Sequence, residues 1–191
     1  MRKPMDKEAG KAFSADHLDV WAFAQAGGQL AGRDQLLKYE RLVLDTQAPR
    51  ADLFVDWQAE GSVRKAPGGV AQVWLQLRVH ATVPLQCQRC LAPVDVPLVV
   101  ERAFRFVADE ATADALDEGC EEDLLVLSHR FDLRALIEDE LILALPLVPL
   151  HDHCPEVVPM VSTDPDFDAA GADKPHPFAA LAGLRKDHGE K

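Results

Sequence analysis

Several features of secreted and membrane proteins are missing from this chain of 191 residues. Its first eight residues are charged and lack the apolar core of a signal peptide. The most apolar run, residues 141–150, is ten residues long and contains two prolines, so it is too short to span a bilayer. There are four cysteines, and in a cytosolic chain cysteines are more often thiols or metal ligands than disulfides. These absences predict a soluble, cytoplasmic protein with no membrane partner.

Basic residues are scarce as well, with 20 lysines and arginines against 32 aspartates and glutamates, a formal net charge of −12. This balance argues against a nonspecific coat on nucleic acid, because neutralising phosphates requires clustered lysine and arginine. The acidity belongs to one segment: residues 106–173 carry a net charge of −16, whereas residues 1–105 and 174–191 each carry +2. Such a segment is either a solvated face or an interaction surface.

Catalytic motifs are also absent from the sequence. It contains no glycine-rich phosphate loop and no nucleophile elbow. Its carboxylate cluster, Glu138-Asp139-Glu140, falls on an expected helix, with Glu138 and Asp139 toward solvent and Glu140 near the buried stripe. We expect Glu138 to pair with Arg134 one turn away on the outside of this helix, and nothing places the carboxylates in a cleft. The sequence therefore predicts no enzymatic activity and no small-molecule substrate.

The strongest secondary-structure signal is a strand over residues 70–87. From residue 71 onward every odd-numbered position in this segment is apolar, while the even-numbered positions are mostly polar. A period of two over this length is typical of a strand in a sheet with one buried face. Residues 94–108 return with a similar pattern, so the two segments predict an antiparallel hairpin with Cys87 and Cys90 at its tip.

Helices are expected on either side of this hairpin in the sequence. Ser14 as an N-cap predicts a helix over residues 15–26, and Asp132 as an N-cap predicts a helix over residues 133–145 that Pro146 ends. The predicted fold class is therefore α+β, with an antiparallel sheet of about four to six strands and a few short helices packed on it.

Three weaker signals complete the secondary-structure prediction. Short strands are expected at residues 53–59 and 124–127. The acidic, glycine-containing residues 109–123 predict a loop.

The chain divides into three parts by composition. Residues 1–13 are polar and predict a flexible N-terminus, and residues 14–154 predict a single α+β domain. Residues 155–191 predict an acidic, proline-rich tether that ends in a short helix over residues 177–184.

Cys87 and Cys90 form the first half of a candidate zinc site, because two thiolates separated by two residues can hold one side of a tetrahedral ion. The second half lies just beyond the proline that ends the helix. There, either His151 or His153 together with Cys154 completes a closed Cys₃His set of the structural type. The alternative is that Cys87 is a packed core residue and the others bind no metal. A redox role is disfavoured, since that motif normally opens a helix after a strand.

Several basic side chains are candidates for contact with RNA. They are Arg78, His80, Arg89, Arg102 and Arg105 of the hairpin, together with Lys174, Arg185 and Lys186 near the end of the sequence. Trp74 shares the outer strand face with Arg78, and its ring is expected to pack against another element rather than to stack on a base.

Three blocks occur in a recognisable order along the chain. They are Leu85-Gln86-Cys87-Gln88-Arg89-Cys90, then Ile137-Glu138-Asp139-Glu140-Leu141-Ile142-Leu143-Ala144-Leu145-Pro146 with Cys154 beyond it, then Lys174-Pro175-His176-Pro177-Phe178-Ala179. Together they resemble the YceD family, the large ribosomal RNA subunit accumulation proteins, over most of the chain. Some members of that family carry more cysteines after the proline block, which favours metal binding, whereas this sequence has only His151, His153 and Cys154 there.

The resemblance implies a bacterial, cytoplasmic, non-enzymatic ribosome-biogenesis factor. Such a factor promotes synthesis, processing or accumulation of 23S ribosomal RNA, and its partner is the large-subunit RNA or its precursor particle. The alternative is an acidic chaperone for a basic ribosomal protein, which uses the charge of residues 106–173. Either function is compatible with a structural zinc ion as the sole cofactor.

Overall fold

The computed structural model describes residues 13–66 and 68–156. The predictions for residues 1–12, for the tether from residue 157 onward and for the helix over residues 177–184 lie outside the described residues. Within the described ranges, no helix combines the length and the apolar character needed to cross a membrane.

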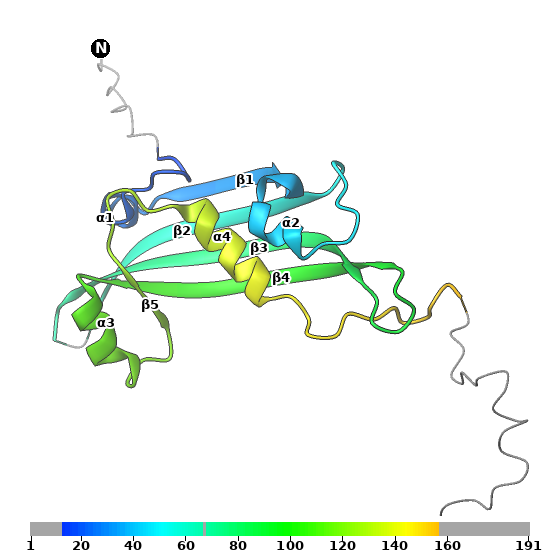
Figure 1. Cartoon of the computed structure of the whole chain (residues 1–191). Helices are drawn as coiled ribbons and strands as arrows, with labels where there is room; N and C mark the ends of the chain where they lie inside the picture. Colours follow the sequence, from blue (N-terminus) through cyan, green and yellow to red (C-terminus); the bar gives the residue numbers. More distant parts are fainter. Residues whose placement is uncertain (1–12, 67, 157–191) are drawn as a thin grey trace, which may run out of the picture. The chain divides into compact units, whose positions relative to one another are not determined.

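A five-stranded sheet organises the described part of the chain, and its strands lie side by side in sequence order (Figure 1). The strands are β1 (Gln29–Gln35), β2 (Phe54–Lys65), β3 (Ala71–Gln86), β4 (Pro93–Val107) and β5 (Asp123–Val126). The first four pair antiparallel, which confirms the predicted hairpin over β3 and β4. β5 pairs parallel to β4, so the sheet is mostly but not entirely antiparallel. The α+β prediction is confirmed.

Four short α-helices and one 3₁₀ turn accompany the sheet in the described ranges. They are α1 (Val20–Gln25), the 3₁₀ turn Leu36–Lys38, α2 (Glu40–Leu44), α3 (Glu110–Asp117) and α4 (Leu133–Leu143). α2 and α4 contact each other and lie across one face of the sheet, and α3 lies near β5 (Figure 1).

The first helix begins later than predicted, because its N-cap is Asp19 and not Ser14. The Asp19 carboxylate accepts a hydrogen bond from the backbone N–H of Ala22 at 3.0 Å, which satisfies one of the unpaired donors of the first turn. The residues before it are held in extended pairing, since Leu18 bridges Phe131. The expected helix over residues 15–26 is therefore too long by its first turn.

The acidic segment after β4 contains α3, so the prediction of a loop over residues 109–123 is wrong in part. Asp109 caps this helix by accepting a hydrogen bond from the Thr112 N–H at 2.8 Å. Alternating alanines fill much of the helix and favour it intrinsically. None of its residues is buried, which explains why it has no apolar stripe to read in the sequence.

The core lies between the sheet and the helices. From Val73 onward the odd-numbered residues of β3 point into it, and five of them are at most 1% exposed: Val73, Leu75, Leu77, Val79 and Val83. The buried stripe of α4 packs against this face and comprises Leu133, Leu136, Ile137 and Leu141. On the opposite, outer face of the sheet, the even-numbered side chains in the middle of the strands remain largely exposed.

Glu138 of α4 holds α2 in place. Its carboxylate accepts hydrogen bonds from the backbone N–H groups of Arg41 and Leu42 at 2.7 and 3.2 Å, and from Arg41 Nε at 2.9 Å. These N–H groups belong to the first turn of α2, where a carboxylate satisfies unpaired donors and the helix dipole favours negative charge. The predicted pair of Glu138 with Arg134 is wrong, because Arg134 binds Asp34 at 2.7 Å instead.

We expect Glu138→Ala to lower the free energy of unfolding by about 1–2 kcal/mol, because it removes a helix cap together with an ion pair. Urea unfolding measures this loss. Asp139→Ala is the matched control: its half-exposed carboxylate pairs with the same Arg41 side chain at 2.6 Å, and its loss should cost about 0.5 kcal/mol. Equal losses in the two variants would contradict the capping role.

Candidate metal centre

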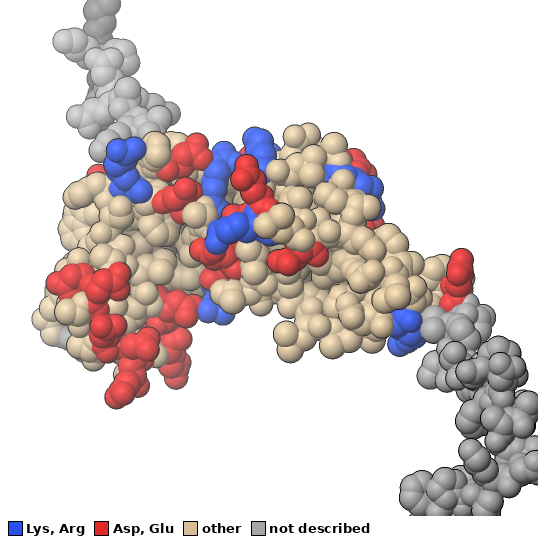
Figure 2. Space-filling model, viewed as in Figure 1, with Lys and Arg blue, Asp and Glu red and all other residues tan. Residues whose placement is uncertain are grey.

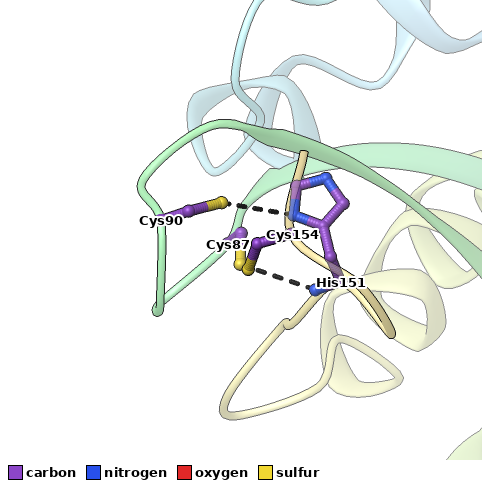
Figure 3. A group of neighbouring side chains, drawn as sticks. All are labelled: Cys87, Cys90, His151 and Cys154. Atoms are coloured by element: carbon purple, nitrogen blue, oxygen red, sulfur yellow. Dashed lines mark hydrogen bonds between the residues drawn. The ribbon is translucent and has the colours of Figure 1, made fainter. Parts of the chain in front are cut away.

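The tip of the β3–β4 hairpin and the segment after α4 bring four side chains together: Cys87, Cys90, His151 and Cys154 (Figure 3). Their ligand atoms all lie within 4.8 Å of one another. The hairpin supplies the first two residues, and the chain beyond the end of α4 supplies the other two. Both halves of the predicted site therefore meet in space, although more than sixty residues separate Cys90 from His151 in sequence.

Backbone hydrogen bonds fix the two halves against each other. The turn at the hairpin tip closes through the Cys87 N–H to the Ala92 carbonyl at 2.9 Å and the Leu91 N–H to the Cys87 carbonyl at 2.8 Å. The Gln88 N–H donates to the Pro149 carbonyl at 2.9 Å, which anchors the segment after α4 to the tip. Because both partners in each of these hydrogen bonds are backbone atoms, the residue types in the sequence do not predict them.

The ring of His151 is oriented for binding through Nδ1. Its Nε2 lies 3.0 Å from the Pro93 carbonyl oxygen, which can only accept, so Nε2 carries the proton. Nδ1 is then the basic nitrogen, and it lies 3.4 Å from the Cys90 sulfur. A histidine that donates its other ring proton to a carbonyl is the usual arrangement at metal sites.

The Cys87 sulfur is poised to be a thiolate. Burial raises its pKa, but backbone N–H groups of Cys90, His151 and Arg89 donate toward the sulfur and outweigh burial, which brings the pKa to about 5. The His151 N–H lies 3.5 Å from this sulfur. Because the thiolate is the form that binds metal, the backbone around Cys87 favours coordination.

The donor set fits zinc. Three cysteine sulfurs and one imidazole nitrogen make up a Cys₃His donor set, the kind that closed, tetrahedral structural zinc sites use. A catalytic zinc would need a fourth position open to water, and four protein ligands leave none.

Two other candidates lie outside the cluster. Of the two candidate histidines, His151 belongs to the group of neighbouring side chains, while His153 is exposed and is not part of it. Cys120 is half-buried and accepts a hydrogen bond from Arg105 Nη1 at 3.6 Å. These two residues are therefore natural controls for the ligands.

The candidate RNA-contact residues are divided between paired and open positions. Trp74 is 6% exposed and packs under the Arg64 guanidinium, 4.3 Å from its ring centroid, so the expectation of packing is confirmed. Arg102 is held by Asp123 and by Glu140, whose pKa burial raises. Arg78 and His80 are exposed on the outer sheet face, where Arg78 also pairs with Glu101 at 2.9 Å.

A family model described as "Large ribosomal RNA subunit accumulation protein YceD" matches residues 75–185. The chain belongs to the YceD family. A relative with the same description from Haemophilus influenzae is 40% identical over 111 residues, which are 57% of this chain and 63% of the relative. The match thus covers less than two thirds of the relative's length. No solved structure matches the chain.

The YceD match contains all four residues of the cluster, together with most of β3, β4, β5 and α4. β1, β2, α1 and α2 precede it. The part of the chain shared with the family is therefore the part that builds the hairpin tip and the segment facing it.

Proposed function

We propose that this protein is a non-enzymatic, cytoplasmic ribosome-biogenesis factor that promotes synthesis, processing or accumulation of 23S ribosomal RNA. Membership of the YceD family, whose model is described by accumulation of the large ribosomal RNA subunit, carries this proposal. The closed donor set supports a structural rather than catalytic role for the candidate zinc ion, held by Cys87, Cys90, His151 and Cys154. The partner is the large-subunit RNA or its precursor particle.

Deleting the gene is expected to lower the ratio of 23S to 16S ribosomal RNA, because the cell would accumulate less 23S RNA without the factor that promotes its accumulation. Quantifying the two RNAs from exponentially growing cells measures the effect, and the wild-type gene supplied on a plasmid is expected to restore the ratio. An unchanged ratio in the deletion strain would overturn the proposal.

A second candidate function is favoured by the acidic region around α3 and β5. Residues 109–123 contain eight acidic residues and no basic one, and red side chains gather over this region in Figure 2. Such a surface complements a basic ribosomal protein. Photo-crosslinking in cells distinguishes the two: crosslinks from residue 114 to one ribosomal protein support a chaperone, and crosslinks from the hairpin to RNA support the first proposal.

A further inference from the structure

The outer face of the sheet carries a continuous trough. Two hollows of about 450 and 350 Å³ adjoin there and share Ala31, Gln58 and Arg78 in their linings. A third hollow of about 230 Å³ continues from the second at Asp56 and His80. Every residue that lines the three hollows belongs to β1, β2, β3 or β4, so the trough crosses the strands and is built by the sheet alone.

The strand register sets the order of side chains in this outer-face trough. Gln58 of β2 lies between Ala31 of β1 and Arg78 of β3. One step along the strands, Asp56 is paired with His80. In the first of these rows Ala31 is small, while the side chains of Gln58 and Arg78 beside it are long and polar, which leaves room above Ala31.

The side chains of the trough suit nucleic-acid bases. Gln29, Gln58 and Gln76 present amides that both donate and accept, and Arg78 presents a planar fork of donors. Amides and guanidinium groups of this kind bind base edges in pairs of hydrogen bonds. His80 adds a flat ring on which a base can stack. A sheet face with such groups is suited to unpaired bases, because in an RNA duplex the edges and faces of the bases are already paired and stacked.

The trough is close to balanced in charge, unlike the region around α3. Arg33 pairs with Asp56 at 3.7 Å and Arg78 with Glu101 at 2.9 Å, and all four side chains are at least half exposed. Exposed pairs of this kind contribute little, so the arginines can turn from a carboxylate to a phosphate at low cost. Glu60 also lines the first hollow, where it accepts a hydrogen bond from Gln29 at 3.4 Å, so the trough has no excess of positive charge. The eight acidic residues of 109–123, of which Asp123 pairs with Arg102, repel a phosphate backbone more strongly than the trough does.

We propose that the outer-face trough binds single-stranded RNA, with Arg78 and the three glutamines contacting base edges and phosphates and His80 stacking on a base. This inference rests on the proposed function, since it names the surface through which the protein meets ribosomal RNA. It also separates two roles in the hairpin: its middle contacts RNA, and its tip holds the candidate metal.

The test uses the full chain and a fluorescent single-stranded RNA of mixed sequence and about 12 nucleotides, a length typical of sheet-based sites. Fluorescence anisotropy is expected to show binding that Arg78→Glu and the double variant Gln58→Ala/Gln76→Ala each weaken about tenfold or more. The matched control is Arg130→Glu, a charge reversal at an exposed residue outside the trough, and it should change the Kd less than about twofold. Thermal melting verifies that each variant is folded.

The same RNA carrying 4-thiouridine is expected to crosslink to peptides from β2 and β3. Three results would overturn the trough: no RNA binding by the wild-type chain, equal weakening by Arg78→Glu and Arg130→Glu, or crosslinks confined to residues outside β1–β4. None of these depends on the 23S to 16S ratio. If deletion of the gene lowers the 23S to 16S ratio but the trough binds no RNA, only the proposal of RNA binding at the trough is refuted. If the trough binds RNA but the ratio is unchanged, the proposed function is refuted.

Discussion

Zinc is expected to copurify with the full chain at about one ion per molecule under reducing conditions, and Cys90→Ser is expected to abolish this stoichiometry. The reason is the closed set of four donors at the hairpin tip, in which removal of one thiolate leaves an incomplete tetrahedron. Metal analysis of the purified protein, with release of the ion by a thiol-modifying reagent, measures both.

Removing the ion is expected to destabilise the fold strongly. An ion that binds only the folded state, present at about a thousand times its Kd, stabilises by about 4 kcal/mol. For a domain of this size that corresponds to a fall in Tm of about 8–16 °C when a chelator removes the metal. Calorimetry with and without chelator measures the shift.

Two pairs of variants make this prediction specific. Cys120→Ser changes a half-buried cysteine outside the cluster, and His153→Ala changes an exposed histidine two residues from the ligand. Both should retain zinc and the wild-type Tm, whereas Cys90→Ser and His151→Ala should not. Zinc-free protein with an unaltered Tm, or equal loss of zinc in the control variants, would refute the site.

Asp34→Ala is expected to have the second largest effect, a loss of about 3 kcal/mol in the free energy of unfolding. Asp34 is 6% exposed and accepts hydrogen bonds from Trp57 Nε1 at 2.8 Å and from Tyr39 Oη at 3.4 Å. Arg134 of α4 binds it at 2.7 Å, so this carboxylate ties β1 to α4. The substitution leaves a buried indole N–H and a buried hydroxyl without their acceptor.

Urea unfolding measures the loss, and Asp56→Ala provides the control. Asp56 lies on β2 with half of its side chain exposed and pairs with Arg33 at 3.7 Å, so its removal should cost about 0.5 kcal/mol or less. Similar losses in both variants would show that burial of the Asp34 network contributes little.

The same carboxylate makes stability depend on pH. Burial raises the pKa of Asp34, but the hydrogen bonds from Arg134 and Trp57 outweigh it, and the net pKa is lowered. A lowered pKa means that the stabilisation is complete above the unfolded value of about 3.9 and is lost as the pH falls through the folded value. Asp34→Asn should therefore lose less stability than the wild type between pH 5 and pH 2, as measured by urea unfolding across that range.

The long strand β3 could be predicted from the sequence because one face of the sheet is buried and the other is exposed to water. One face packs on α4 and the other is exposed to water, so polarity alternates along the strand. The alternating apolar row ends at Cys87, which directly follows the last residue of the strand. The buried apolar stripe of α4 could be predicted for the same reason, because one face of this helix packs on the sheet and the other is exposed. The metal ligands could be grouped because two of the four cysteines, Cys87 and Cys90, are separated by only two residues and a third, Cys154, directly follows a segment with two histidines.

The remaining features depend on contacts that one segment cannot reveal. No residue of α3 is fully buried, so no clear apolar period marks it, and its cap resembles any aspartate in an acidic run. Glu138 and Arg134 have the right spacing for a pair within α4, but each finds a better partner on another element. The choice of Asp19 over Ser14 as the cap depends on the extended pairing of Leu18, which is a tertiary contact.

The order of the strands in the sheet, which equals their order in the chain, has a consequence for synthesis on the ribosome. Each strand that leaves the exit tunnel finds its neighbour already made, so the sheet can grow strand by strand, and the connections from β2 to β3 and from β3 to β4 are the shortest to close. The hairpin tip is different, because Cys87 and Cys90 must wait for His151 and Cys154 to emerge. The group is complete only after the five strands of the sheet and α4 have been synthesised, so the candidate site forms last in this part of the nascent chain.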